Sequence, residues 1–260
     1  MKRFSQVACA FALASIATAY AGGAVMAAPG IASGFYFGLG GATNDVHLHS
    51  AAQMTTGTGT AVDNTEFAQH ALSPIADAGY WAPLSGQWLW GVQLRYKYIN
   101  QHDSAALPAI SSLGNPDFFQ SLQVSQRIDI QHEMLALGYL GTQFDKGFAY
   151  IGFGAGILRV GSGVVDSSRN FGTTEDPAYL SNVSQTHSFL VGIAGQVGYN
   201  YFFKRDWFLS FDYTYVHVSD TLKHTVTAMT GESPATAMLS YKVDFDDQQF
   251  TASINKVFAY

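Results

Sequence analysis

A histidine and a serine two residues apart, His217 and Ser219, form the spacing in this chain that most directly suggests chemistry. Alternate residues of an extended strand point to the same side, so these two side chains would lie close together on one face. A serine nucleophile needs a neighbouring histidine as its base and a third group that orients the histidine. Glu232 is the candidate for the third role, but Gly231 and Pro234 flank it and nothing in the sequence fixes its position. A polar strand end without catalytic function is therefore the favoured interpretation.

A second histidine pair, His47 and His49, has the same spacing and could bind a transition metal if both side chains lay on one side of a strand. No third ligand is visible nearby in the sequence. A solvated histidine pair is favoured, and no metal site is predicted.

Polar side chains also occur inside segments that otherwise alternate between apolar and small residues. Buried groups of opposite charge are expected to pair with one another. The side chains predicted to point away from the apolar face of their strands are Arg95, Lys97, Glu133, Gln196 and Asp212.

The elements that must position these groups are clearest in one hairpin. Alternate residues from Val191 to Phe203 are apolar or aromatic apart from Gly195, with small or polar residues between them. The same period runs from Trp207 to Tyr215, and the polar residues 204–206 lie between the two segments. This pattern predicts an antiparallel hairpin with one apolar and one polar face.

The composition favours a β-barrel that crosses a membrane. Only 12% of the 260 residues are charged, whereas soluble domains have about 25%. The chain is rich in Phe, Tyr and Gly, yet beyond the N-terminal region it has no run of about 18 apolar residues that would form a membrane helix. Few charges, many aromatic residues and no apolar helix together indicate membrane-crossing strands.

The N-terminal region has the pattern of a secretory signal. A basic start precedes a mostly apolar stretch at 4–20, and small residues favour cleavage after Ala27, with Ala21 as the alternative. We therefore expect a signal peptide at 1–27, which also contains the only cysteine, Cys9. Without its two basic residues the chain keeps 11 basic and 19 acidic residues, a net charge of −8, which argues against a nucleic-acid partner.

The remaining chain, 34–260, is predicted to form a single all-β domain, an eight-stranded antiparallel up-and-down transmembrane β-barrel. The expected strands are 34–43, 71–82, 88–98, 124–144, 148–160, 189–203, 207–217 and 241–260. Long polar loops at 44–70, 99–123, 161–186 and 219–239 alternate with short turns at 83–86, 145–147 and 204–206. Outer-membrane barrels have short periplasmic turns and long extracellular loops, whereas a soluble barrel of this strand count would have a polar outside.

The last strand supports a resemblance to a known family. Its residues of one parity are mostly apolar and end on an aromatic residue: Phe250, Ala252, Ile254, Phe258 and Tyr260, with Lys256 as the exception. Residues 34–260 resemble the small eight-stranded outer-membrane barrels of Gram-negative bacteria, the OmpA-like and opacity-type family. The resemblance implies a location in the cell outer membrane, contact with its lipid and lipopolysaccharide, and a C-terminal assembly signal at Phe258 and Tyr260 that the barrel assembly machinery transiently binds. A periplasmic peptidoglycan-binding domain is not expected.

Eight strands enclose a space that side chains just fill, so the interior is expected to be closed and free of cofactors. We expect a non-enzymatic structural, adhesion or other surface-interaction role, through the four long loops and a partner that the sequence does not identify. A narrow channel is one alternative. The other is an enzyme, because the His217 and Ser219 spacing resembles that of outer-membrane lipid A deacylases, with Glu232 as the third residue.

Overall fold

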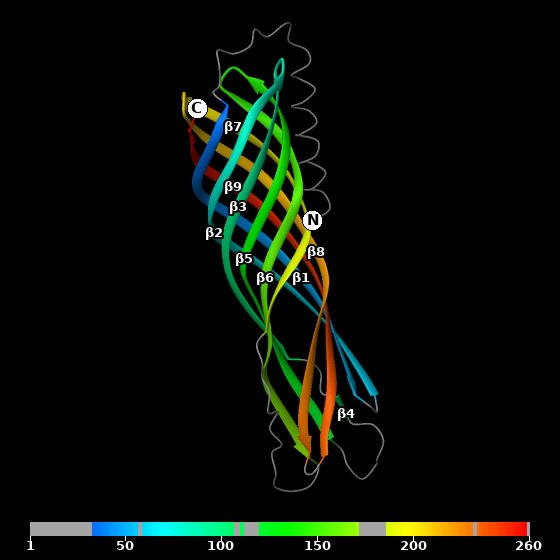
Figure 1. The fold of residues 1–260 in the computed structure, drawn as a ribbon. Helices are drawn as coiled ribbons and strands as arrows, with labels where there is room; N and C mark the ends of the chain where they lie inside the picture. Colours follow the sequence, from blue (N-terminus) through cyan, green and yellow to red (C-terminus); the bar gives the residue numbers. More distant parts are fainter. Residues whose placement is uncertain are drawn as a thin grey trace.

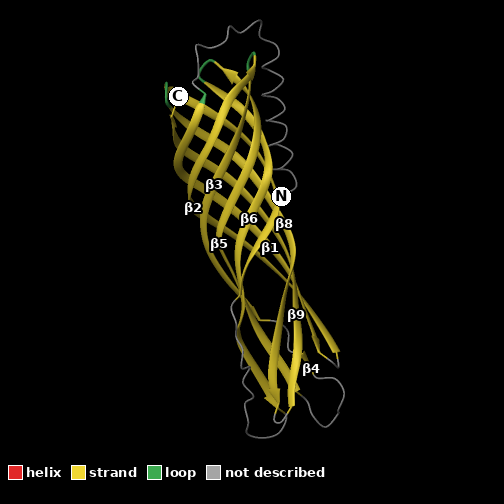
Figure 2. Cartoon of the chain, viewed as in Figure 1, coloured by secondary structure: helices red, strands yellow, loops and turns green. Residues whose placement is uncertain are grey.

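A computed structural model describes residues 33–56, 59–106, 110–111, 120–171, 186–230 and 233–258, and these residues form strands and tight turns (Figures 1 and 2). The strands are β1 (Gly34–Thr56), β2 (Gly59–Ser85), β3 (Trp88–Ala106), β4 (Ile110–Ser111), β5 (Gln120–Phe144), β6 (Gly147–Phe171), β7 (Thr186–Lys204), β8 (Trp207–Thr230) and β9 (Ser233–Phe258). No helix in the described part of the chain is long and apolar enough to cross a membrane.

Eight long strands close into an antiparallel up-and-down barrel, which confirms the predicted fold class. Each long strand pairs with the next long strand along the chain, including β3 with β5, and the pairing of β1 with β9 closes the circle. The two-residue strand β4 adds only to β5. Gly34 pairs with Trp81 and Phe35 with Phe258, so both ends of the described barrel lie at the rim that carries the short turns.

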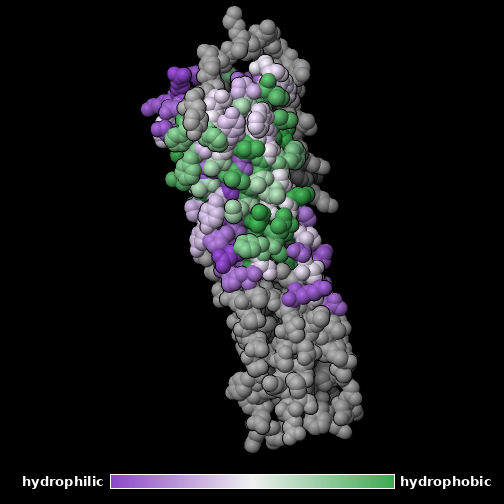
Figure 3. Space-filling view, in the orientation of Figure 1, coloured by the Kyte–Doolittle hydropathy of each residue, from purple (hydrophilic) through white to green (hydrophobic). Residues whose placement is uncertain are grey.

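The two faces of the sheet have opposite character, as period-two alternation requires. On β3, the outward residues Trp88 to Tyr98 are 40–58% exposed, whereas Leu89, Gln93, Arg95 and Lys97 are at most 4% exposed. Apolar residues in the equivalent outward positions of the other strands form a belt around the barrel. Figure 3 shows this hydrophobic belt with hydrophilic residues beyond it at both ends.

The strands continue far beyond the segments predicted from alternation, so the predicted loops were largely wrong. β1 and β2 stay paired to Thr56 and Gly59, and β8 and β9 stay paired to Thr230 and Ser233. Beyond the belt both faces of a sheet can be polar, so paired strands there need no apolar alternation. Strand β2 tolerates Pro74, because this residue lies one position past the last β2–β3 pair, Ile75 with Lys97, and its missing N–H can face the unpaired side.

Ile130 has the same parity as the outward residue Met134, yet its side chain is only 4% exposed, whereas that of Met134 is 49% exposed. The β5–β6 pairing shifts between Ile130 and His132, which is a β-bulge. A bulge places two residues of one strand opposite one of its partner and reverses the alternation beyond it. Ile130 and Glu133 can therefore both face the interior although their numbers differ in parity.

Three short turns lie where they were expected, except that residues 83–85 of the first predicted turn belong to β2. Gly86–Gln87 follows β2, Asp145–Lys146 follows β5 and Arg205–Asp206 follows β7. Gly86 has a φ of 56°, in the left-handed region that glycine adopts without a steric penalty.

Amine labelling tests which rim faces the outside. We expect a membrane-impermeant amine reagent on intact cells to modify Lys223 and Lys242, which are exposed on the long extensions of β8 and β9. Lys146 and Lys204, at the short turns, should react only after the cells are permeabilised. Peptide mass spectrometry identifies the sites, and the reverse pattern would mean that the barrel is inverted. Lys97, 0% exposed, should react only after unfolding.

Candidate functional site

Aromatic side chains close the interior near the short turns. Trp81 of β2 lies against Phe148 of β6, with ring centroids 5.5 Å apart. Gly91 leaves room for the ring of Tyr139, since a Cβ at this position would come within 2.3 Å of that ring. The buried members of this cluster are Tyr36, Trp81, Leu89, Tyr139, Phe148, Tyr150, Phe208 and Val257.

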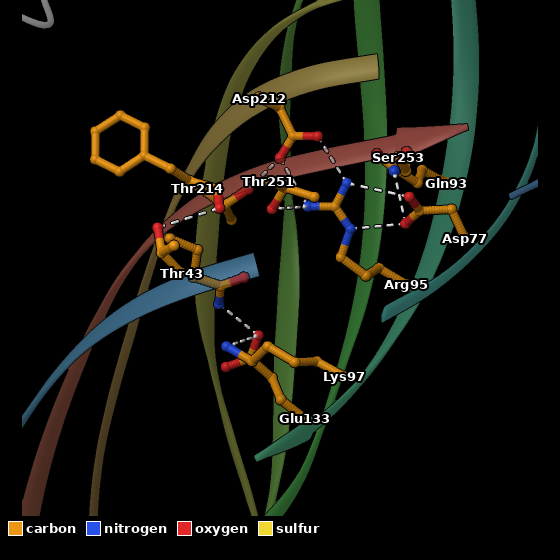
Figure 4. Close-up of polar contacts among 12 residues, drawn as sticks. Thr43, Asp77, Gln93, Arg95, Lys97, Glu133, Asp212, Thr214, Thr251 and Ser253 are labelled. Carbon is orange, nitrogen blue, oxygen red and sulfur yellow. Dashed lines mark hydrogen bonds and ion pairs between the residues drawn. The ribbon is translucent and has the colours of Figure 1, made fainter. Parts of the chain in front are cut away.

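The next layer is organised by Arg95, whose side chain crosses the barrel. Its Nε donates a hydrogen bond to Asp77 Oδ1 on the adjacent strand β2 at 2.7 Å. Its Nη1 and Nη2 each donate to one carboxylate oxygen of Asp212 on β8, both at 2.7 Å (Figure 4). β3 and β8 are four strands apart in either direction around the barrel. One guanidinium therefore joins opposite walls, while Gln93 and Thr214 donate further hydrogen bonds to Asp77 and Asp212.

Lys97 organises a second ionic layer further along β3. Its Nζ lies 3.1 Å from Glu133 Oε1 of β5 and donates a short hydrogen bond to Asp247 of β9. Gln249 Nε2 donates to Glu133 Oε1 at 2.6 Å and to Asp247 Oδ2 at 3.0 Å. β5 and β9 are again opposite strands, so this layer also spans the interior.

Aliphatic side chains fill the interior beyond the two ionic layers. They come from seven strands and are 0–7% exposed: Val46, Leu48, Ile99, Ile130, Leu158, Val160, Leu190, Val216, Val218 and Val243, together with the aromatic Phe245. Buried side chains thus occupy the described interior from the short turns to the level of Leu48, Val218 and Val243.

The structure places all five predicted interior residues inside the barrel, and four of them join the two networks. The fifth, Gln196, is 4% exposed, and its amide makes no hydrogen bond to a described residue. Sequence reasoning missed Asp77, Asp247 and Gln249. The last two could have been found, because the outward assignment of Phe250 makes Gln249 and Asp247 inward.

The structure gives His217 and Ser219 separate carboxylate partners on β9. His217 Nδ1 lies 2.9 Å from Asp246 Oδ1, and Ser219 Oγ donates to Asp244 Oδ1 at 2.5 Å. Both side chains face outward, at the end of the belt. Glu232 lies outside the described residues. Asp246 therefore holds the histidine, and the serine hydroxyl is directed to a different carboxylate.

His47 and His49 face outward on β1, a strand rather than a loop. His47 Nε2 lies 3.2 Å from Asp45 Oδ1, and His70 of β2 approaches the same oxygen with its Nδ1 at 3.3 Å. No group of three or more His, Cys, Asp or Glu side chains among the described residues is arranged to hold a metal ion. Of the residues predicted as an assembly signal, Phe258 faces outward and is 52% exposed, and Tyr260 lies outside the described residues.

A closed barrel with an apolar belt outside and a filled interior that buries charged and polar groups defines the class of outer-membrane β-barrels, because closure pairs the backbone groups that lipid cannot satisfy. The protein is a multi-pass protein of the cell outer membrane.

Solved structures of outer-membrane proteins cover most of this chain. The outer membrane protein OprG from Pseudomonas aeruginosa is 12% identical, covering 90% of this chain and 100% of its own, with a TM-score of 0.45. Ail, the attachment invasion locus protein of Yersinia pestis, is 7% identical, covering 83% and 98%, with a TM-score of 0.34. The outer membrane protease OmpT from Escherichia coli is 7% identical, covering 86% and 97%, with a TM-score of 0.39. No family model matches the chain, and no curated protein matches it in sequence.

Proposed function

We propose that the protein is a non-conducting outer-membrane anchor that presents β-hairpins outside the cell for adhesion or another surface contact. The observation that carries this proposal is the length of the hairpins. On β8 the belt ends near Tyr215 and the strand continues to Thr230, about 50 Å further at roughly 3.3 Å per residue. Paired strands of this length form a stiff platform rather than free loops.

The packed interior supports an anchor rather than a narrow channel. Arg95 links opposite walls through five hydrogen bonds to the carboxylates of Asp77 and Asp212 and to Thr251. An ion would have to displace this guanidinium and the Lys97 layer to pass. In a planar lipid bilayer the refolded protein should therefore show no steady conductance, and discrete open steps that vanish after heat denaturation would favour the channel.

The adhesion role is tested by shortening one hairpin without touching the barrel. We expect deletion of residues 50–65, which removes the outer part of the β1–β2 hairpin, to leave the heat-dependent gel shift of the folded barrel intact. Bacteria that produce the native chain should be retained on cultured epithelial cells or immobilised matrix glycoproteins, and the deletion should reduce that retention. Retention of native producers no higher than that of cells with an empty vector would contradict the proposal.

The lipid A deacylase alternative keeps one favourable observation, the contact of His217 Nδ1 with Asp246, because a carboxylate at this nitrogen orients a catalytic histidine. Against it, the Ser219 hydroxyl donates its hydrogen bond to Asp244 and not to His217. We therefore expect lipid A from producing cells to keep all its acyl chains in mass spectra, and Ser219→Ala to change nothing. Acyl loss with the native protein that Ser219→Ala abolishes would establish the enzyme.

A further inference from the structure

Four histidines and four carboxylates gather on the outward face of β2, β1, β9 and β8. We call this group the imidazole–carboxylate patch, and its members are Asp45, His47, His49, Glu66, His70, His217, Asp244 and Asp246. The chain contains only eight histidines, so half of them lie here.

Strand register brings the patch together from segments far apart in the chain. Asp246 pairs with His217 on one side and with His47 on the other. In the next row, two residues further from the short turns, Asp244 pairs with Ser219 and with His49, and His49 pairs with Glu66. Asp45 and His70 are opposite one another on β1 and β2 and complete the patch.

Every histidine of the patch has a carboxylate beside it. The nitrogen–oxygen distances are 2.9 Å for His217 and Asp246, 3.2 Å for His47 and Asp45, 3.3 Å for His70 and Asp45, and 3.8 Å for His49 and Glu66. Tyr215 also donates to Asp246, and Lys242 lies 2.9 Å from Asp244. On the remaining sides β2 has no β3 partner beyond Ile75, and β7 places the apolar Ile193 opposite His217.

The patch lies at the border of the lipid-facing belt. Its rows begin directly beyond the outward residues Leu72, Phe250 and Tyr215, which are 79%, 61% and 40% exposed. With the short turns in the periplasm, this border meets the headgroup layer of the outer leaflet. The neighbours of an outward side chain at this depth are lipopolysaccharide headgroups, which carry phosphates.

The charge of the patch reverses when its histidines gain protons. With neutral imidazoles, its four carboxylates and Lys242 sum to −3, and with four imidazolium groups they sum to +1. Imidazole ordinarily changes its charge between pH 5 and 8. The hydrogen bond from Ser219 and the contact with Lys242 lower the pKa of Asp244, which lies beyond the belt, so this carboxylate keeps its charge as the pH falls.

We propose that the imidazole–carboxylate patch is an acid-strengthened contact for the phosphate groups of neighbouring outer-leaflet lipopolysaccharide. At neutral pH its negative charge repels phosphate, and in acid its protonated histidines attract it. The opposite side of the barrel differs. There His132 pairs with Arg159, and no carboxylate of the patch lies beside them. The inference does not depend on what the hairpins bind.

The test is a titration of fluorescently labelled lipopolysaccharide with the full-length, detergent-folded protein, followed by anisotropy at pH 5.5 and pH 7.5. EDTA is present so that divalent cations cannot bridge carboxylates and phosphates. We expect the affinity to be about tenfold or more higher at pH 5.5 than at pH 7.5. Four additional positive charges near an anionic headgroup surface are enough for this change, because each contributes nearly as much binding free energy as a tenfold difference in affinity requires. Dephosphorylated lipopolysaccharide should show no such difference.

Two variants with opposite effects keep the proposal falsifiable. Replacing His47, His49, His70 and His217 with Asn should abolish the pH dependence. The double change Asp45→Asn and Asp246→Asn should instead tighten binding at pH 7.5. His132→Asn, on the other side of the barrel, is the matched control and should retain the pH dependence. Equal binding at the two pH values, or a pH dependence that survives in the four-histidine variant or with dephosphorylated lipopolysaccharide, would overturn the proposal. A gel shift on heating verifies that each variant is folded.

Discussion

Replacing Arg95 with Leu should lower the free energy of unfolding by about 3–5 kcal/mol, the largest effect that we expect from a single substitution. The change leaves Asp77 and Asp212 buried, 1% and 6% exposed, without their shared cation. Removing one partner of a buried ion pair is costly because the remaining charge is uncompensated. Urea unfolding in lipid vesicles, followed by tryptophan fluorescence, measures the difference.

Two controls separate the ionic layer from a general effect of losing an arginine. Arg159 faces outward, and Arg159→Leu should shift stability by about 0.5 kcal/mol or less, as surface substitutions usually do. Adding Asp77→Asn and Asp212→Asn to Arg95→Leu removes the uncompensated charges and should recover part of the loss. Equal midpoints for Arg95→Leu and Arg159→Leu would show that the interior network contributes no stability.

The second large effect is expected at the lipid-facing belt. Val197 faces outward near the middle of β7, and Val197→Arg should cost about 2–4 kcal/mol, the range for a basic residue at the bilayer midplane. The cost arises because the guanidinium must leave water for hydrocarbon. Quantitative refolding in vesicles of long-chain and short-chain phosphatidylcholine measures it, and the cost should fall in the thinner bilayer.

The neighbouring residue provides the contrast. Gln196 faces the interior, and Gln196→Arg should hinder folding through crowding and an unpaired buried charge, independently of bilayer thickness. Thr221→Arg, beyond the belt on β8, should be nearly neutral. If Val197→Arg and Gln196→Arg were equally tolerated, the assignment of the two faces would be wrong.

Alternation was sufficient to predict the barrel wherever the chain crosses lipid. There, each outward residue must be apolar and each inward residue must fit a filled interior, so the pattern on β3 identified both faces. The outer parts of β1, β2, β8 and β9 were predicted as loops, because beyond the membrane no hydrophobic period marks a paired strand. The bulge before His132 was also invisible, since one additional residue leaves no local signal.

The interior residues were predicted only from their alternate positions along each strand. These positions do not reveal which interior side chains contact one another. Arg95 and Asp212 are brought together by the closure of the barrel, in which β1 pairs with β9. Asp77 was missed because Pro74 and Asp77 itself interrupt the apolar alternation of the predicted strand 71–82. The patch around Asp246 was missed for a related reason, since its members lie on four strands and only their register makes them neighbours.

The links across the barrel also have a consequence for how the chain folds. Arg95 and Asp212 are 117 residues apart in sequence, and Gln249 and Glu133 are 116 residues apart. Contacts of such separation form only after the intervening loop has closed, so both ionic layers are expected to assemble in the last step, when the first and last strands meet. Interactions absent from the transition state act on the unfolding rate. The two layers would then slow the opening of the closed barrel and prolong its lifetime in the membrane, without changing the rate at which the chain inserts.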